Sequence, residues 1–419
     1  MKNIWILNHY AKLGRGRHYK FAENLTNRGY NIKLFAASTI HNSDENRIND
    51  RTKYIEEVEN GITCVYIKSR NYKGNGRQRV LNMIDYSKGL LSVSKKFHKE
   101  KPDIIYASSV HPLTWIAGYI LAKRFKAKFI AETRDLWPET LVAMGQIKKN
   151  SIPAKLLYAL EKFIYKRADR LIFTFPGGKD YIEHIGLNSS KVRYINNGID
   201  LEEVNKNKEE FIYEDIDLDE KGNFKILYTG SMGQANALKY LIEAAKIIQY
   251  IGKRNIKFIL FGYGYQKEEL EKYIKEKNVN NVIFKGKVDK KYIPSILTKS
   301  NLNVFTGKHI YLYKYGLSLN KMFDYFASGK PTLSNVECGY DMLEEYKCGI
   351  TVKGGSPEAL VEGILKFYNM PKEEYNVYCE NALKAAKDFD FKVLTDKLEK
   401  IILELYPNEK ENYNENSIN

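Results

Sequence analysis

The same local pattern opens both halves of the chain: a short apolar strand, a glycine-containing turn and a helix. Residues 3–8 form the first such strand, and Gly14 and Gly16 lie in the turn that follows it. Residues 224–228 form the second, and Gly230 follows directly. Further apolar strands alternate with helical segments in each half, which predicts an α/β fold with parallel sheets covered on both faces. With 419 residues the chain can build two such cores, because single domains seldom grow beyond about 250 residues.

A charged segment that is poor in glycine separates the two halves. We predict an N-terminal domain over residues 1–200, a connecting segment over 201–223 and a C-terminal domain over 224–388. An apolar segment at 389–406 has helical spacing and is expected to form a final helix. The polar residues 407–419 are predicted to be disordered.

The composition narrows the classes of protein and of partner. The four cysteines lie without metal-ligand or disulfide spacing, which predicts a reduced, cytoplasmic protein. No run approaches the ~20 apolar residues of a membrane span, and the N-terminus lacks a signal-peptide pattern. The formal net charge of +16 favours anionic partners, among them nucleic acid, acidic lipid and phosphorylated small molecules. Aromatic residues sit within apolar runs and form no RNA-binding motif, which argues against nucleic acid.

Residues 315–331 predict a glycine-bearing loop, a capped helix and the start of a strand. Ser318 is the expected N-cap, Gly329 ends the helix, and Met322, Phe323 and Phe326 form its buried face. The unpaired N–H groups and the dipole at such a helix start suit a diphosphate. Asp324, about one turn further in, is placed to accept hydrogen bonds from a ribose diol. A capped amphipathic helix that binds nothing explains the same pattern.

This stretch resembles the donor-sugar motif of family-4 glycosyltransferases, in the branch that includes fucosamine-transferase-like enzymes of O-antigen and capsule synthesis. The matching run is Ser318-x-Asn320-Lys321-x-Phe323-Asp324-Tyr325-x-Ala327-Ser328-Gly329-Lys330-Pro331. The family carries two glutamates here, and the second holds the nucleotide ribose; Asp324 stands at that second position. Gly316 stands at the first, so the usual ligand of the sugar hydroxyls is missing. The resemblance implies that Ser318, Asn320 and Asp324 bind the donor.

A second motif, Arg134-Asp135-Leu136-Trp137-Pro138-Glu139, is similar to the same branch. In many relatives a histidine near this position approaches the transferred sugar, and Arg134 stands there in this chain. Arginine does not act as a base, because its pKa stays above ~12, but it can bind phosphate. His111 matches a His-Pro element of the branch and is expected to contact the donor sugar. His111, Arg134, Asp135 and Lys321 are the candidate catalytic residues. The structural alternatives are a loop histidine at 111, a buried ion pair of Glu132, Arg134 and Asp135 that fixes the loop, and a surface lysine at 321.

The glycine turns are assigned to the donor as well. Gly14 and Gly16 let the backbone approach a ligand, and Arg15, Arg17 or His18 is placed to face phosphate, although the spacing is not G-x-G-x-x-G. In the second half the donor-binding candidates are Gly230, Ser231, Gly233 and Gly262. Relatives place an arginine and a lysine after this strand, whereas residues 231–237 contain no cation. Asn236 stands where the lysine would be, and Lys321 is the candidate for the missing charge.

The resemblance implies a GT-B fold, with two facing Rossmann-like domains and a C-terminal helix that crosses back to the N-terminal domain. It implies a retaining transferase without a metal or cofactor, acting on a nucleotide-diphosphate sugar. UDP is the favoured carrier, an N-acetylated amino sugar the favoured group, and a glycan or polyprenyl-pyrophosphate-linked molecule the acceptor. A non-hydrolysing nucleotide-sugar epimerase on the same fold and a basic, non-catalytic binding protein are the alternatives.

Residues 148–170 predict a basic amphipathic helix. Such a helix fits an anionic membrane surface, which would make the protein peripheral at the inner face of the plasma membrane. A solvated basic face over a stripe that faces the core explains the same residues.

Overall fold

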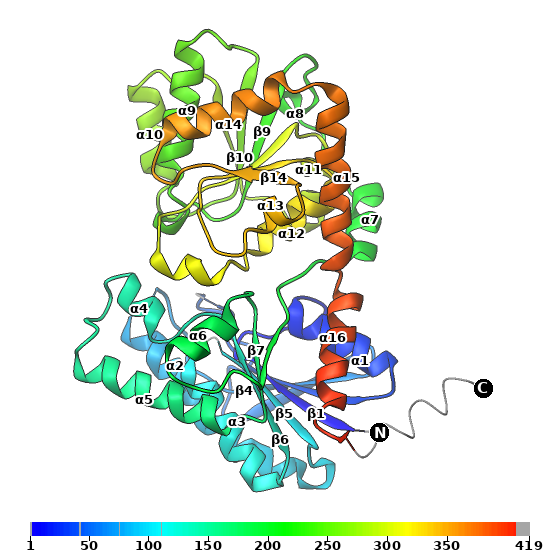
Figure 1. The fold of residues 1–419 in the computed structure, drawn as a ribbon. Helices are drawn as coiled ribbons and strands as arrows, with labels where there is room; N and C mark the ends of the chain where they lie inside the picture. Colours follow the sequence, from blue (N-terminus) through cyan, green and yellow to red (C-terminus); the bar gives the residue numbers. More distant parts are fainter. Residues whose placement is uncertain (1, 42, 75, 110, 408–419) are drawn as a thin grey trace. The chain divides into compact units, whose positions relative to one another are not determined.

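The computed structural model describes residues 2–41, 43–74, 76–109 and 111–407. They form two compact units, each shown in Figure 1. The first unit runs to Asn196 and takes in the segment that begins at Phe391, and the second comprises Asn197–Asp390. Apart from Pro407, the predicted disordered tail lies outside the described residues.

The first unit is built on an eight-stranded sheet in the order β3-β4-β2-β1-β5-β6-β7-β8. Neighbouring strands are parallel, except that β3 pairs antiparallel with β4. The central strands are buried along nearly their whole length, as expected for a sheet with helices on both faces. The strands are β1 (Asn3–Leu7), β2 (Asn31–Ala37), β3 (Tyr54–Glu59), β4 (Ile62–Ile67), β5 (Ile104–Ser109), β6 (Lys128–Thr133), β7 (Arg170–Phe173) and β8 (Val192–Tyr194). The helices are α1 (Arg17–Asn27), α2 (Arg77–Val93), the 3-10 helix η1 (Ser94–Glu100), α3 (Pro112–Phe125), α4 (Glu139–Ala143), α5 (Ile152–Arg167), α6 (Gly178–His184) and α16 (Phe391–Leu403).

The C-terminal helix α16 packs in the first unit, which confirms the expected return of the chain. Phe391 lies edge-on to Phe21 of α1, with 5.8 Å between the ring centroids. Arg28, just after α1, forms ion pairs with Asp396 and Glu399 of α16, each at 2.6 Å. The two helices lie side by side in Figure 1. The apolar contact fixes the docking, while the two partly exposed ion pairs add little stability.

The second unit contains a six-stranded parallel sheet in the order β11-β10-β9-β12-β13-β14. Its strands are β9 (Phe224–Thr229), β10 (Ile256–Phe261), β11 (Val282–Gly286), β12 (Leu302–Phe305), β13 (Thr332–Ser334) and β14 (Gly349–Thr351). Its helices are α7 (Leu201–Glu210), α8 (Ile216–Asp219), η2 (Gln234–Asn236), α9 (Lys239–Tyr250), α10 (Lys267–Glu276), η3 (Lys290–Tyr292), α11 (Ile293–Thr298), η4 (Tyr311–Tyr315), α12 (Asn320–Ala327), α13 (Met342–Glu345), α14 (Pro357–Asn369) and α15 (Lys372–Asp388).

Residues 201–223, predicted as a connecting segment, carry the two helices α7 and α8 and lie within the second unit. Asp200 caps α7 by accepting a hydrogen bond from the Glu203 N–H at 3.0 Å, and Asp215 caps α8 in the same way. Acidic caps stabilise the positive end of a helix, so a charged, glycine-poor segment can be helical without a long apolar stripe.

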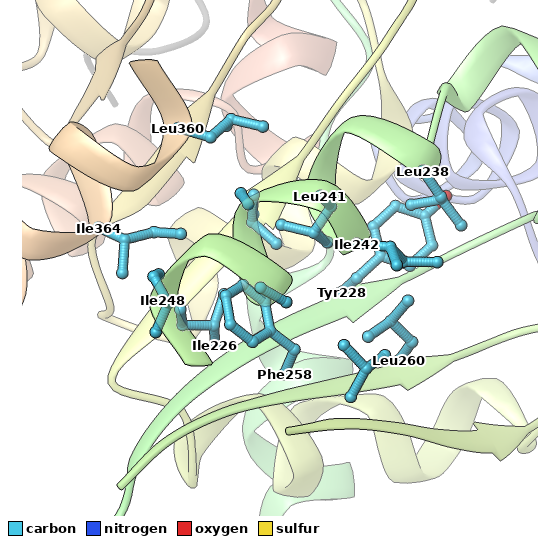
Figure 2. Close-up of a cluster of buried hydrophobic side chains, with 14 of the residues drawn as sticks. Ile226, Tyr228, Leu238, Leu241, Ile242, Ile248, Phe258, Leu260, Leu360 and Ile364 are labelled. Carbon is cyan, nitrogen blue, oxygen red and sulfur yellow. The ribbon is translucent and has the colours of Figure 1, made fainter. Parts of the chain in front are cut away.

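The core of the second unit lies between the sheet and the helices α9 and α14 (Figure 2). Tyr228 of β9 and Phe258 of β10 are fully buried there, together with Leu241 of α9 and Ile364 of α14. Burying each such side chain contributes about 1.5–3 kcal/mol. This packing holds the ends of the strands in fixed positions.

In both sheets the strand order reverses beside the first strand of the unit. β2 and β5 flank β1, and β10 and β12 flank β9. In open parallel sheets, ligands bind outside the carboxyl ends of the strands at such a reversal. The candidate sites are therefore the loops after β1 and β5 in the first unit and after β9 and β12 in the second.

Candidate functional site

In the second unit, the short helix α12 is tied to the end of the sheet. The Tyr325 hydroxyl accepts a hydrogen bond from the Thr229 N–H of β9 at 3.0 Å and donates to the Val304 carbonyl of β12 at 3.1 Å. Phe323 and Phe326 are buried and pack against the ring of Phe389. These contacts bind the helix to the two strands that flank the reversal in strand order.

The start of α12 differs from the prediction. The helix begins at Asn320 with Leu319 in the N-cap position, and no side chain caps it. The Ser318 hydroxyl instead accepts a hydrogen bond from the Asn197 N–H at 3.2 Å, and the Ser318 carbonyl accepts one from Asn197 Nδ2 at 3.0 Å. Ser318 was therefore wrongly predicted as the N-cap, because a partner distant in sequence takes its hydroxyl. Asn320 itself is exposed.

Lys321 projects from the first turn of α12 toward the end of β9. Its ammonium donates hydrogen bonds to the Tyr228 hydroxyl and to Asn236 Oδ1, both at 2.9 Å, and lies 4.3 Å from the centre of the Tyr228 ring. No carboxylate forms an ion pair with it among the residues that the structure describes. Burial lowers the pKa of Lys321 to about 7, because a charged amine loses its hydration there. The cation thus reaches Asn236, the position where relatives are expected to carry a lysine.

The loop after β9 leaves room for this ammonium because Gly230 has no side chain. Its φ is +148°, and a Cβ there would lie 3.0 Å from Lys321 Nζ. Gly262 is required for a different reason: a Cβ on it would lie 1.7 Å from the Gly230 carbonyl oxygen, so the two loops pack backbone against backbone. Gly262 is explained by this packing alone, whereas Gly230 borders the cationic side chain.

The backbone N–H groups of residues 230–233, which are expected to help hold the diphosphate, are only partly available. The Gly230 N–H is bonded to the Phe261 carbonyl and the Met232 N–H to the Tyr263 carbonyl. Within the described part of the chain, the N–H groups of Ser231 and Gly233 donate to nothing. Two of the four expected donors therefore remain for a ligand.

Asp324 lies one turn beyond Lys321 on α12 and is half-buried. Its carboxylate neither accepts a hydrogen bond nor forms an ion pair with any described residue. Burial raises the pKa of the Asp324 carboxyl above its ordinary value, and Lys290 only partly offsets this. A desolvated carboxylate without a partner is costly unless a ligand supplies hydrogen-bond donors.

In the first unit, His111 is fully buried at the start of α3, and three side chains fix its tautomer. Asn82 Nδ2 donates to the Arg70 carbonyl at 2.6 Å and to the Thr39 hydroxyl at 3.1 Å, which turns Asn82 Oδ1 toward His9. His9 Nε2 must then carry the proton that bonds Asn82 at 2.7 Å. The neutral His9 ring accepts through Nδ1 from His111 Nε2, also at 2.7 Å. This leaves His111 Nδ1 as a buried acceptor with no partner among the described residues.

Both rings stay neutral at physiological pH. Burial lowers the pKa of His9 to about 3, although its bond to Asn82 works in the opposite direction. Burial, followed by the neighbouring His9, lowers the pKa of His111 well below its ordinary value. His111 can therefore accept a hydrogen bond from a hydroxyl but does not act as a cation.

Three residues of the first glycine turn were predicted as candidates to face phosphate. Arg17 and His18 pair within the fold instead, whereas Arg15 is exposed. Arg17 forms an ion pair with Glu132 at 2.8 Å and also donates to the Asn196 carbonyl. His18 Nε2 bonds the other carboxylate oxygen of Glu132 at 2.8 Å, and Tyr106 donates to Glu132 at 2.6 Å. Burial would raise the pKa of Glu132, but Arg17 and His18 outweigh it and hold that pKa well below its usual range. The ion-pair alternative thus holds for Glu132.

The ion-pair alternative does not hold for Arg134 and Asp135, which follow β6. The Arg134 N–H donates to the Ser109 hydroxyl at 3.3 Å, and its carbonyl accepts from Thr174 at 3.4 Å. The backbone is held, while neither charged side chain has an ion-pair partner in the described ranges. Asp135 is exposed and Arg134 is partly exposed. Both are thus free to meet a ligand.

Gly14 and Gly16 both adopt positive φ, at +74° and +89°. A Cβ on Gly14 would lie 3.3 Å from Glu59 Oε1, and Gly16 is the N-cap of α1. The positive φ accounts for a glycine at both positions, and Gly14 lies against the Glu59 carboxylate.

Two family models match the chain, one in each half. The model described as glycosyltransferase family 4 matches residues 18–203, and the model described as glycosyl transferases group 1 matches residues 209–385. The chain is a glycosyltransferase of GT-B fold. The fucosamine-transferase branch is a finer assignment than these matches give.

Similar proteins agree with this assignment. An uncharacterized glycosyltransferase of Methanocaldococcus jannaschii is 26% identical over 295 residues, which cover 68% of the transferase and 71% of that protein. Sucrose-phosphate synthase of Thermosynechococcus elongatus shares the fold with a TM-score of 0.73 and 18% identity, covering 97% of the transferase and all of that chain. HepE of Anabaena, solved in complex with UDP and glucose, has a TM-score of 0.65 and 14% identity over 96% and 99% of the two chains.

The described residues of the transferase contain no cluster of three or more His, Cys, Asp or Glu side chains arranged to hold a metal ion. Nor does any helix among them have the length and apolar character needed to cross a membrane.

Sequence reasoning missed several residues that shape these sites. His9 and Asn82 orient His111, Tyr325 anchors α12, Tyr228 holds Lys321, and Asn197 holds the loop before α12. His9 was detectable, since it is a polar residue directly after the first strand. Asn82 and Asn197 were not, because their partners lie far away in the sequence.

Proposed function

We propose that the transferase moves an N-acetylated amino sugar from a UDP donor to a glycan or polyprenyl-pyrophosphate-linked acceptor, with retention of configuration. The UDP carrier is supported by the ligand of the HepE structure, which shares the fold. The sugar, the acceptor and a role in capsule or O-antigen synthesis rest on the resemblance of residues 318–331. We further propose that the reaction takes place on the cytoplasmic side.

The observation that carries the proposal is the pair of unneutralised charges on α12. Lys321 contacts only neutral polar groups, and the Asp324 carboxylate has no partner among the described residues. A nucleoside diphosphate would satisfy both, because its phosphates would neutralise the ammonium and its ribose diol would donate to the carboxylate. The Ser231 and Gly233 N–H groups and the start of the helix add donors for the phosphates.

The same charges suit the chemistry of transfer. Negative charge develops on the diphosphate as the bond to the sugar breaks, and preorganised donors stabilise it most where water is excluded. Lys321 can supply this stabilisation, so we expect transfer without a metal ion. In the first unit, His111 Nδ1 would accept a hydroxyl of the transferred sugar, and Arg134 would bind a phosphate of the donor or the acceptor. Asp135, exposed beside Arg134, is the remaining candidate at this edge.

A panel of nucleotide sugars tests the donor. A ligand at 100 times its dissociation constant stabilises the folded state by about 2.7 kcal/mol, which raises the thermal midpoint measurably. We expect UDP-N-acetylglucosamine or UDP-N-acetylgalactosamine to give the largest shift, and the GDP and dTDP sugars to give none. A shift with GDP or dTDP sugars alone would overturn the choice of UDP, and no shift with any member would overturn the proposed site.

Incubation with the donor alone separates transfer from epimerisation. A transferase leaves the sugar unchanged, apart from slow hydrolysis, until an acceptor is added. A UDP-sugar converted to its epimer without an acceptor, detected by chromatography, would overturn the proposal in favour of the epimerase.

A further inference from the structure

The helix α5 of the first unit exposes apolar side chains that its sequence pattern would place in the core. Ile152 is 76% exposed and Leu156 is 67% exposed, and Ala159 and Phe163 on the same face are also exposed. Their spacings of four, three and four residues bring the side chains onto one stripe of the helix. Met144, at the C-terminal end of α4, is exposed too. The exposed face of α5, predicted to be basic and solvated, therefore also carries an apolar stripe.

The exposed charges that α5 itself carries have one sign, and Lys149 before it pairs with Glu139 of α4 at 3.8 Å. The exposed charged side chains of α5 and of the two residues at 148–149 are all cations: Lys148, Lys149, Lys155, Lys162, Lys166 and Arg167. Lys155, Lys162 and Lys166 form no ion pair with any residue in the described ranges. The single acid of the helix, Glu161, is buried, and its two oxygens share a hydrogen bond from the Tyr181 hydroxyl, at 2.9 and 3.1 Å. Burial raises the pKa of Glu161 to about 8, so this acid is mostly protonated at neutral pH.

The helix α15 of the second unit shows what an ordinary exposed helix of this chain looks like. It also carries exposed apolar side chains, Val377 and Leu383, but their separation of six residues places them on different faces. Its charges are mixed: Lys372, Lys384 and Lys387 alternate with Glu373, Glu374, Glu380 and Asp388. The apolar stripe with cations alone is thus a feature of α5 and does not follow from the overall charge of the chain.

We propose that α5 docks this transferase on the surface of an anionic phospholipid bilayer, with Ile152, Leu156 and Phe163 inserted between the headgroups and the lysines beside them on lipid phosphates. An apolar stripe flanked by cations matches the bilayer surface, where anionic headgroups lie over apolar acyl chains. A protein partner would need acidic groups around an apolar groove, and nothing in the chain favours that pairing. This inference goes beyond sugar transfer and does not depend on the identity of the donor.

Cosedimentation of the full chain with vesicles tests the proposal. We expect binding to vesicles of phosphatidylglycerol and phosphatidylcholine in equal parts, weaker binding at high salt, and none to phosphatidylcholine alone. Each cation near an anionic leaflet changes partitioning about fivefold, so Lys155→Glu with Lys162→Glu should lower binding about 25-fold or more. Ile152→Ser with Leu156→Ser should lower it comparably. The matched controls on α15, Lys384→Glu with Lys387→Glu and Val377→Ser, should bind like the wild type.

Fluorescence of two single tryptophan substitutions reports insertion directly. Leu156→Trp should shift its emission to the blue when anionic vesicles are added, and Val377→Trp should not. The proposal is overturned if the α15 controls lose binding as strongly as the α5 variants, if neutral vesicles bind equally well, or if no vesicle binds. It is also overturned if the wild type is dimeric in solution and Leu156→Ser makes it monomeric, since the stripe is then an interface between copies. None of these outcomes involves a nucleotide sugar, so they leave the proposed function untouched.

Discussion

Charged and polar residues lie at the carboxyl ends of both sheets, but those of the first unit pair with one another and those of the second unit do not. In the first unit, Glu132 is paired with Arg17 and His18, and His9 links His111 to Asn82. In the second unit, Lys321 bonds only neutral groups, and Asp324 bonds nothing among the described residues. Buried charges that neutralise each other hold a fold together, whereas charges left without partners are costly unless a ligand binds them. The comparison makes Glu132 and its partners structural, and it supports the proposal that the unpaired charges of the second unit bind the donor.

The largest expected effect on stability concerns the buried ion pair of Glu132 with Arg17. Replacing Glu132 with Ala leaves the buried Arg17 without a counter-charge, which should lower the free energy of unfolding by about 3–5 kcal/mol. The control is Glu399→Ala, which breaks a partly exposed pair with Arg28 and should cost at most about 1 kcal/mol. Urea denaturation of both variants checks this, and equal losses would show that Glu132 is no more structural than a surface acid.

In contrast to Glu132→Ala, Asp324→Ala should abolish donor binding without lowering stability. Because the carboxylate has no partner to lose, the free energy of unfolding should stay the same or rise slightly. Stabilisation by the best UDP-sugar, about 2.7 kcal/mol at 100 times the wild-type dissociation constant, should disappear. Thermal unfolding with and without the donor measures both quantities. A variant that loses stability but keeps its response to the donor would make Asp324 structural and remove it from the donor site.

Lys321→Met should weaken UDP binding with little change in fold. Hydrogen bonds to charged groups are worth about 1.5–3 kcal/mol, which corresponds to a loss of at least tenfold in affinity by calorimetric titration. Lys384→Met, an exposed lysine on α15, is the control and should bind UDP like the wild type. Equal affinity of Lys321→Met and the wild type would remove Lys321 from the donor site.

The smallest expected effect concerns the chain of His111, His9 and Asn82. Asn82→Leu removes the group that fixes the His9 proton, so both rings can exchange tautomers and His111 Nδ1 no longer stays an acceptor. We expect kcat/KM to fall about tenfold, the size of one misplaced hydrogen bond. Nitrogen-15 NMR of histidine-labelled protein should show Nε2-protonated His9 and His111 in the wild type and mixed tautomers in the variant. Unchanged tautomers in the variant would show that Asn82 does not position His111.

The sequence predicted the fold well because periodic apolar patterns decide it. The alternation of strands and helices, the buried face of α12 and the return of α16 are all present. Local rules were weaker where a distant partner competes, as when Asn197 takes the hydroxyl of Ser318. The packing reason for Gly262 could not be predicted either, since it lies in the carbonyl of Gly230 in another loop.

Charged residues were the hardest to interpret from the sequence. Arg17 and Lys321 are both cations near a glycine turn, and only their partners distinguish them. Arg17 meets a buried carboxylate and Lys321 does not. Likewise, the apolar stripe of α5 has the spacing of a core face, and only its exposure shows that it is not one.

The pKa of Lys321, measured with and without UDP, tests the central claim most directly. The ammonium has a pKa of about 7 in the free protein, and a diphosphate bound beside it favours the charged form and must raise that pKa. UDP binding should therefore take up a proton above pH 7, and affinity should fall as the pH rises beyond the free value. Carbon-13 NMR of labelled lysines, with the signal assigned by Lys321→Met, follows this titration. The account predicts an upward shift at saturating UDP, and a bound protein whose Lys321 pKa stays near 7 would contradict it.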